Sequence, residues 1–376
     1  MATSSVNAVI NWSSEARLLR WLTMLWVAVG LVMLFSASYP IAQESTGDGL
    51  YFVKRQALWI GLGTGAFSLL VRLPTRVWWR LAGLLCLISI LTVWATHIPA
   101  IGVERLEATR WLSLGPISVQ PSEFLKPLLV LQGSLLFGRW YHHSLLYRCG
   151  WLAIFALGLL GILTQPNLGT TAICGLTLWV MAWTAGLPIG SLVGSALLGL
   201  LMAVASILTK DYQRRRVMAF LDPWASAQGD GYQLIQSLMA IGSGGVWGQG
   251  FGLSQQKLFY LPITYTDFIF SVFAEEFGLI GSLLFLALLT AYTLLGLRVM
   301  LLSHEMTHRL IVCGSLGFLV GQSILNLGVV SGALPTTGVP LPLFSYGGSS
   351  VLSGMITAGL LVRVAREVGG SNGANR

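Results

Sequence analysis

Ten apolar runs recur along this chain, and most are about as long as a helix that crosses a lipid bilayer. Such a helix needs about 20 apolar residues for a hydrocarbon core of ~30 Å. Only 10% of the residues are charged, whereas about 25% are charged in a typical soluble domain. The sequence therefore predicts an all-α polytopic membrane protein with about ten transmembrane helices. The runs occupy residues 19–39, 55–72, 77–96, 121–139, 148–165, 169–186, 189–208, 277–299, 309–330 and 346–367.

The distribution of Lys and Arg predicts how the chain is threaded through the membrane. Cytoplasmic loops of membrane proteins are enriched in both residues, and here most arginines flank the runs on the side that the N-terminus shares. Both termini are therefore predicted to be cytoplasmic, and the 97–120 segment extracytoplasmic. We predict a cytoplasmic tail at 1–16, a ten-helix domain at 17–367 and a second cytoplasmic tail at 368–376. The large loop at 209–266, between helices 7 and 8, is predicted to be extracytoplasmic.

Net charge and cysteine spacing narrow the possible partners. The net charge of +8 follows from this topology and from the anionic lipids of the inner leaflet, so it indicates membrane lipids rather than nucleic acid. Four cysteines show no metal-ligand spacing and are expected to be free thiols packed within the bilayer. They are Cys86, Cys149, Cys174 and Cys313. The cysteines therefore indicate neither disulfides nor a metal site.

Two charges stand at the start of the fourth run, in "PSEFLKP". Glu123 and Lys126 are three residues apart and are neighbours on one helix face. One interpretation is an ion pair at the bilayer surface, with the lysine side chain extended toward water. The other is a cation inside a cavity that faces an anionic substrate, because charges at membrane depth are functional candidates.

The 211–252 segment begins with three consecutive arginines, Arg214, Arg215 and Arg216. Its turn residues are typical of a solvated basic loop. Alternatively, apolar residues at helical spacing between Tyr232 and Ile241 predict an amphipathic segment that lies on the membrane. The arginines would then lie where a lipid-linked phosphate binds, since guanidinium groups match phosphate oxygens well. Three consecutive arginines cannot share one helix face.

Three carboxylates, those of Asp267, Glu275 and Glu276, stand at the edge of an apolar run. At 100° per helical residue, Glu275 lies about 80° around from Asp267 and Glu276 roughly opposite to it, so the three cannot form one cluster. One of the two glutamates is expected to meet a basic or polar partner from a neighbouring helix. Asp267 fits either a helix N-cap or a general base for chemistry on a lipid-anchored substrate.

The stretch from residue 326 to 350 is rich in proline and glycine between two apolar runs. It is typical either of a rigid turn or of a re-entrant segment that lines an aqueous cavity, because lipid-exposed backbone must be regular. Two classes of function remain at this point. A transporter places irregular backbone and charges near the bilayer midplane, whereas a transferase for lipid-linked sugars places them at one membrane face. The polar segments here all fall on one face, which favours the enzyme.

Five stretches, in this order, resemble the SEDS family (shape, elongation, division and sporulation) of ten-helix peptidoglycan polymerases. They are "RWLSLGPISVQPSEFLKP", "QPNLGTT", the loop from Asp222 to Gly252, "KLFYLP" with "TDFIFSVFAEEFG", and "LPTTGVPLPLFSYGGSS". The resemblance extends from about Tyr51 to about Arg363. The wording "SQQKLFYLP" and the compact length are more similar to the division branch than to the elongation branch.

The resemblance implies polymerisation of lipid II. In that reaction the 4-hydroxyl of an acceptor GlcNAc attacks C1 of the donor MurNAc with inversion and expels undecaprenyl pyrophosphate. Asp267 matches the family's essential aspartate and is assigned the role of base or catalytic carboxylate. Lys126 and Glu123 match the family's "SExxK", with Lys126 expected to face phosphate. Cavity or pyrophosphate-binding roles are expected for Arg110, Trp111, Arg214, Arg215, Arg216, Gln165, Asn167, Ser345 and Ser349.

The sequence departs from the family pattern just before Asp267. Ile263 stands in place of a common glutamate, and Tyr265 in place of a histidine. A divalent cation (Mg²⁺ or Mn²⁺) that bridges pyrophosphate and carboxylate fits the chemistry. No ligand spacing demonstrates such a site, and the two missing residues weaken the case for one.

Partners and location also follow from the resemblance. It implies a class B penicillin-binding transpeptidase and other proteins of the division machinery as partners, in the bacterial plasma (inner) membrane at the division septum. The sequence leaves three alternatives open. These are a lipid II flippase, a noncatalytic scaffold for division proteins, and a polymerase of the elongation type.

Overall fold

The computed structural model describes residues 12–99, 102–105, 108–115, 117–258, 260–262 and 264–374. Each of the ten predicted spans corresponds to a helical segment, which confirms an all-α polytopic membrane protein. These segments are α1 (Ser14–Thr46), α2 (Tyr51–Arg72), α3 (Thr75–Ala95), α4 (Pro121–Gly138), α5 (Leu145–Thr164), α6 (Leu168–Thr184), α7 (Ile189–Thr209), α10 (Ile269–Leu302), α11 with α12 (Met306–Leu316 and Gln322–Val330), and α13 (Gly348–Ala374). Seven of them are long and apolar enough to cross a membrane, and α6 is a shorter apolar helix.

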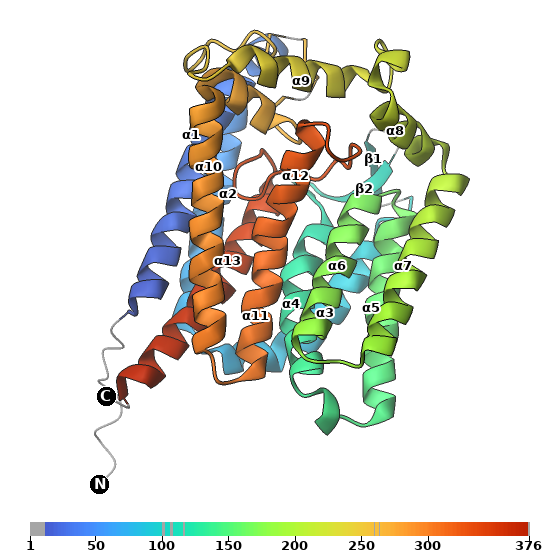
Figure 1. The fold of residues 1–376 in the computed structure, drawn as a ribbon, viewed down its shortest axis with the longest axis vertical. Coiled ribbons are helices and arrows are strands. Elements are labelled where there is room, and N and C mark those ends of the chain that lie inside the picture. Colours follow the sequence, from blue (N-terminus) through green and yellow to red (C-terminus); the bar gives the residue numbers. More distant parts are fainter. Residues whose placement is uncertain are drawn as a thin grey trace.

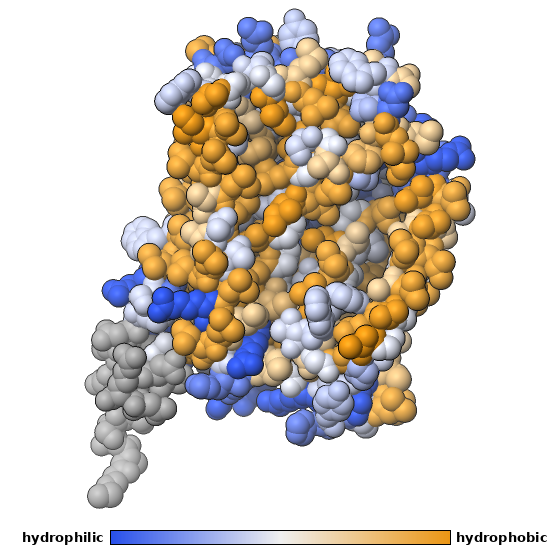
Figure 2. All heavy atoms as spheres, in the orientation of Figure 1, coloured by the Kyte–Doolittle hydropathy of each residue, from blue (hydrophilic) through white to orange (hydrophobic). Residues whose placement is uncertain are grey.

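Both chain ends approach the same end of the bundle. Figure 1 shows the first residues of α1 and the last residues of α13 at the lower end, and the short helices α8 (Asp211–Leu221) and α9 (Tyr232–Gly244) at the upper end. We call this upper end the outer end. The relative placement of the termini and of the 209–266 loop is therefore as predicted. In Figure 2 hydrophobic residues cover the side of the bundle, and hydrophilic residues gather at its two ends.

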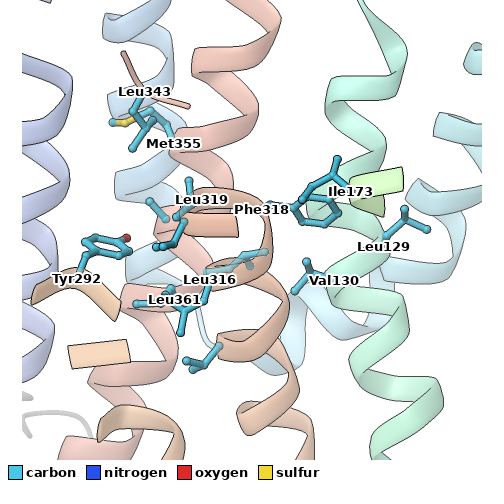
Figure 3. Close-up of a cluster of buried hydrophobic side chains, with 14 of the residues drawn as sticks. Leu129, Val130, Ile173, Tyr292, Leu316, Phe318, Leu319, Leu343, Met355 and Leu361 are labelled. Atoms are coloured by element: carbon cyan, nitrogen blue, oxygen red, sulfur yellow. The ribbon is translucent and has the colours of Figure 1, made fainter. Parts of the chain in front are cut away.

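The interior of the bundle is built around α4, α11, α12 and α13. Of the 18 residues of α4, 14 are buried, whereas α7 buries only Leu192 and Ser206 and lies at the periphery. Figure 3 shows the core where these helices meet, with Val130 of α4 near Phe318, which follows α11. Helices buried on every side pack against protein rather than lipid, so α4 and α13 are the elements that can hold polar groups away from the bilayer.

A small antiparallel sheet in the 97–120 segment was not predicted. Its strands are β1 (Gly102–Arg105), β2 (Ala108–Leu114) and β3 (Ile117–Val119), in the order β1-β2-β3. Leu112 of β2 pairs with Gly102 on one side and with Val119 on the other. The sheet leads directly into α4, whose first residue, Pro121, suits the start of a helix because its missing N–H would be unpaired there in any case.

The outer part of α10 differs most from the prediction. The helix begins at Ile269, eight residues before the predicted span, and is broken at Gly278, which has φ of 65° and ψ of −161°. Residues 245–250 run alongside the break. The backbone N–H groups of Gln249 and Gly250 donate to the carbonyls of Glu275 and Glu276, and those of Leu279 and Ile280 donate to Gly245 and Val246. The break therefore leaves these backbone groups paired, as membrane depth requires.

The 209–266 loop contains two short α-helices, α8 and α9, and a 3₁₀ turn at Pro223–Ser226 between them. The predicted amphipathic segment forms α9, which lies across the outer end of the bundle (Figure 1). Leu234 and Ile235 of its apolar face are buried, whereas Leu238 and Met239 are exposed. Part of the apolar face thus packs on the bundle rather than on the membrane. The four cysteines are free, as predicted.

Candidate active site

Three charged side chains, from β2, from α8 and from the turn before α10, converge at the outer end of the bundle, around Gly338. A Cβ atom placed on this glycine would lie 3.5 Å from Nη1 of Arg216, 3.6 Å from Oδ2 of Asp267 and 3.9 Å from Nη1 of Arg110. Neither guanidinium forms an ion pair with Asp267 within 4.0 Å in the described part of the chain. The carboxylate and the two cations therefore face a shared gap that lacks a side chain.

Both arginines are held by backbone carbonyl groups rather than by carboxylates. Arg110 of β2 donates from Nε to the carbonyl of Gln165 at 3.1 Å and from Nη2 to that of Pro166 at 2.7 Å, both in the α5–α6 turn. Arg216 of α8 donates from Nη1 to the carbonyl of Thr336 at 3.1 Å, and its guanidinium stacks 4.5 Å from the ring of Tyr212. Because neutral groups orient them, both arginines keep their charge available for an anion.

The backbone around Asp267 is fixed from three directions. Asn326 of α12 donates from Nδ2 to the carbonyls of Asp267 and Val339, at 2.8 and 2.9 Å. Ser345 donates to the carbonyl of Thr266 at 2.7 Å, and the backbone N–H of Tyr346 donates to the carbonyl of Tyr265 at 2.9 Å. Asp267 itself precedes the N-cap residue of α10, which is Phe268. Its carboxylate is therefore positioned without being used as the cap of that helix.

Burial and the neighbouring arginines shift the pKa of Asp267 in opposite directions. Burial raises the pKa of this carboxyl group above its ordinary value, while the guanidinium groups of Arg216 and Arg110 act against that rise. Burial in turn lowers the pKa of Arg110. A carboxylate with a raised pKa accepts a proton more readily than an ordinary aspartate, which is a property that a general base requires.

Glu123 and Lys126 form a buried ion pair on α4, with Oε1 and Nζ 2.8 Å apart. Lys126 also donates to Oε1 of Gln322 at 2.9 Å, and Gln322 donates to the carbonyl of Pro340 at 2.8 Å. A small cavity beside them has room for about one water molecule. Gln322 directly follows a π-helical turn, Gly317–Gly321, a type of turn that often occurs at functional sites. The burial of both side chains argues against the predicted ion pair at the bilayer surface and fits the other interpretation, in which Lys126 lies inside the bundle beside a cavity.

The other predicted site residues are distributed around this centre. Arg214 pairs with Asp211 at 2.7 Å and Arg215 with Asp230 at 3.4 Å, both on the exposed side of α8. The structure therefore brings Arg216, but neither of its two neighbours, to Asp267. Trp111 follows Arg110 on β2, and successive strand residues face opposite sides.

Gln165, Asn167 and Ser349 make hydrogen bonds within the fold. Gln165 donates from Nε2 to Thr96 Oγ1 at 2.7 Å, and Asn167 caps α6 by accepting from the N–H of Thr170 at 3.3 Å. Ser349 accepts from the N–H of Gln120 at 3.0 Å, next to the start of α4. Gln165 and Asn167 thus hold the α5–α6 turn whose carbonyls accept from Arg110, and Ser349 holds the residue before α4, the helix that carries Lys126.

Glu275 and Glu276 support the outer part of α10. Glu276 accepts from Nζ of Lys257 at 2.7 Å and from Ser36 of α1 at 2.6 Å. Glu275 accepts from the hydroxyl of Ser254 and from the N–H groups of Gln255 and Gln256. The two glutamates and Asp267 have different partners, as the helical geometry predicted. Tyr265 stacks on Phe52, with ring centroids 4.5 Å apart, and Ile263 lies outside the described residues.

The sequence interpretation missed Gly338, Gln322 and Asn326 as residues of the site. Gly338 has φ of +70°, a conformation that favours glycine, and its place in a proline-glycine segment was the available signal. Gln322 and Asn326 are four residues apart, one helical turn, inside an otherwise apolar run. Polar pairs with that spacing in a membrane helix indicate one shared interior face.

Within the ranges that the structure describes, no group of three His, Cys, Asp or Glu side chains could hold a metal ion. The side chains nearest Asp267 that carry charge are arginines, which repel cations. This donor set does not fit a resident metal site at Asp267.

Comparisons with known proteins agree with this architecture. The chain is 56% identical over 359 residues to a probable peptidoglycan glycosyltransferase FtsW of Synechocystis sp., covering 96% of this chain and 91% of that protein. It is 35% identical to stage V sporulation protein E of Bacillus subtilis, covering 94% and 98%. Among solved structures, it is similar to a chain described under "Structural coordination of polymerization and crosslinking by a peptidoglycan synthase complex", with TM-score 0.75, 30% identity and coverage of 95% and 99%. The rod shape determining protein RodA of Thermus thermophilus matches with TM-score 0.67, 29% identity and coverage of 93% and 96%.

A family model described as "Cell cycle protein" (FTSW_RODA_SPOVE) matches residues 16–369. The match extends over all ten helical segments and includes the loops that carry Arg110, Arg216, Asp267 and Gly338. The chain therefore belongs to the FtsW, RodA and SpoVE family of cell cycle proteins, the SEDS family that its five sequence motifs predicted.

Proposed function

We propose that this protein is a peptidoglycan glycosyltransferase that joins lipid II units into glycan strands and releases undecaprenyl pyrophosphate. The observation that carries the proposal is the gap around Gly338, where one carboxylate faces two guanidinium groups. A glycosyl transfer from a pyrophosphate donor needs a proton acceptor at the attacking hydroxyl and positive charge at the leaving group. Relatives named peptidoglycan glycosyltransferase FtsW support the same function.

Asp267 is the proposed base. It accepts the proton of the acceptor 4-hydroxyl while that oxygen forms a bond to C1 of the donor sugar. The bond between C1 and the pyrophosphate oxygen breaks on the opposite face, and the electron pair leaves with undecaprenyl pyrophosphate. The configuration at C1 is therefore inverted, and the proton resides on Asp267 until solvent removes it.

Arg110 and Arg216 are proposed to bind the leaving pyrophosphate. Backbone carbonyl groups, which carry no net charge, hold both guanidinium groups in place. Their positive charge is therefore available to the pyrophosphate of the substrate. Lys126 has Glu123 and Gln322 as partners already, so in this scheme it stabilises the floor of the site through Gln322 and Pro340. The direct phosphate contact expected for Lys126 requires that this buried pair open.

A divalent cation, if used, would arrive with the pyrophosphate of the substrate. Arg110 and Arg216 occupy two sides of the gap around Asp267, and no group of three His, Cys, Asp or Glu side chains that could hold a metal ion is found among the described residues. We propose that arginine supplies the resident positive charge. Adding or chelating Mg²⁺ and Mn²⁺ in the polymerisation assay tests this point.

We further propose a role in septal wall synthesis in the bacterial plasma membrane, with both termini cytoplasmic and a class B penicillin-binding transpeptidase as partner. The names of the FtsW relatives support the division role. A structural neighbour from a peptidoglycan synthase complex supports a partner that crosslinks strands. Localisation of a fluorescent fusion to mid-cell, together with co-purification of the transpeptidase, tests both parts.

The decisive experiment measures glycan strands made from labelled lipid II by the purified protein, alone and with the transpeptidase. Wild type is expected to make polymer, and Asp267→Asn and Asp267→Ala to make none while keeping the wild-type unfolding temperature. Asp230→Asn is the matched control, since Asp230 is exposed and its ion pair in the described part of the chain is with Arg215, away from Asp267. Full polymerisation by folded Asp267 variants would refute the base assignment. Lipid II translocation in vesicles, with no polymer in any condition, would support a flippase instead.

A further inference from the structure

A second charged cavity lies at the opposite end of the bundle from Asp267. Its volume is about 260 Å³, and it is lined by Arg363, Arg366, Glu367 and Gly370 of α13. The start of α1 packs against this part of α13, where Ser13 donates to the carbonyl of Ala365 at 3.1 Å. None of these residues belongs to the site described above.

The two arginines of the cavity differ in how their charge is used. Arg363 donates from Nε and Nη2 to Oε1 of Glu367, at 2.8 and 2.7 Å, which neutralises that carboxylate. Arg366 donates from Nη1 to the carbonyl of Val71 at 3.1 Å. Its Nε is buried and has no acceptor in the described part of the chain. Arg366 thus carries an unneutralised charge and an unused donor beside the cavity.

A second guanidinium, that of Arg20, contacts the same tryptophan ring as Arg366. Both Arg366 and Arg20 of α1 stack on the ring of Trp12, at 5.2 and 5.1 Å from its centroid. Arg20 is exposed and forms no ion pair with a described carboxylate. The two guanidinium groups that share the Trp12 ring place two positive charges in one region, which attracts an anion.

An exposed apolar surface continues from this point along α1. Leu18, Trp21 and Leu25 share one helix face and are 50%, 67% and 50% exposed, and the guanidinium of Arg20 lies 5.9 Å from the Trp21 ring. Tryptophan is typical of the level of lipid headgroups. The arrangement places cationic groups at headgroup depth and an apolar surface at acyl-chain depth.

We propose that the phosphate of an anionic phospholipid binds beside this cavity, held by Arg366 of its lining and by Arg20, which shares the Trp12 ring with Arg366, with the acyl chains lying along Leu18 and Leu25. Phosphate oxygens suit two guanidinium donors, and the continuous apolar face favours a lipid over free phosphate. Each arginine near an anionic membrane surface raises the affinity for the lipid about fivefold, and the two arginines act together.

The test measures lipid binding by the purified full chain with native mass spectrometry and thermal unfolding, using phosphatidylglycerol, phosphatidylcholine or inorganic phosphate. Wild type is expected to bind and be stabilised by phosphatidylglycerol above phosphatidylcholine. Arg366→Gln and Arg20→Gln are each expected to reduce that preference about fivefold. The matched control is Arg80→Gln, because Arg80 is exposed at the same end of the bundle outside the cavity.

Each outcome of the test bears on the proposal. An equal preference for phosphatidylglycerol in Arg20→Gln and Arg80→Gln would overturn it, as would stabilisation by inorganic phosphate alone to the same degree. Arg20 is exposed, so Arg20→Gln keeps the test valid even if Arg366→Gln fails to fold. Loss in both cavity variants, with polymerisation and fold retained, supports the site independently of the glycosyltransferase.

Discussion

Replacing Gly338 with alanine is the sharpest test of the gap between Asp267 and the two arginines. The added methyl group would lie 3.5 Å from Arg216 Nη1 and 3.6 Å from Asp267 Oδ2, which are ordinary contact distances. It would therefore fit without a clash but fill the place that a substrate oxygen must take. Gly338 has φ of +70°, and an L-residue in that region costs roughly 1–2 kcal/mol of stability.

The effect on catalysis should exceed this backbone effect. A displacement of the reacting groups by ~1 Å can lower the rate about 100-fold, so Gly338→Ala is expected to lose about two orders of magnitude in kcat/KM for lipid II. Gly332→Ala is the matched control, because Gly332 has φ of +72° and its nearest neighbours are the flexible ends of Leu238 and Leu234.

The assay compares initial polymerisation rates on labelled lipid II with unfolding temperatures for both alanine variants. The expected pattern is a similar small loss of stability in each and a large loss of activity only in Gly338→Ala. Equal activity in the two variants would refute the reasoning that this gap holds the substrate.

Three further predictions concern charge. Arg216→Gln should lower kcat/KM by about 10²- to 10³-fold, whereas Arg214→Gln, which removes an exposed charge, should stay near wild type; equal losses would contradict the assignment of Arg216 alone to the site. Burial raises the pKa of Asp267, and a base is active only when deprotonated, so activity is present above this pKa and lost as pH falls through it. Arg216→Gln removes a guanidinium that opposes the rise, so the acidic limb of the kcat/KM profile should move to higher pH, and an unmoved limb would argue against Asp267 as the base. Lys126→Met leaves Glu123 buried without a counter-charge and should destabilise the protein by roughly 3–5 kcal/mol. In thermal unfolding, the double variant with Glu123→Gln should recover a large part of that lost stability. If the double variant recovers none of it, the two charges are not coupled.

The sequence predicted the membrane helices well because burial in lipid demands long apolar runs. It placed the start of α10 eight residues late for a physical reason. Residues 269–276 include Glu275 and Glu276, whose charges lower local hydropathy, yet both are buried with partners from α1 and from residues 254–257. Partners distant in sequence leave no local pattern, so the helix could be recognised only from tertiary structure.

The sequence identified several residues of the site but not how they are arranged in space. Asp267 was identified through the family motif, and helical geometry showed that three consecutive arginines could not act together. Which arginine faces Asp267 depends on how β2, α8 and the turn before α10 meet, and no spacing encodes that. The small sheet was missed because its strands are short and lie in a loop of mixed polarity.

The break at Gly278 divides α10 into an outer segment before residue 278 and a membrane segment after it. The outer segment begins just after Asp267. Hydrogen bonds connect it to residues 245–258 and, through Glu276, to Ser36 of α1. The first residues after the break are also held, because the N–H groups of Leu279 and Ile280 donate to the carbonyls of Gly245 and Val246. Because residues 245–250 hold both sides of Gly278, we expect a displacement of residues 281–302 within the bilayer to leave Asp267 in its position beside Arg110 and Arg216.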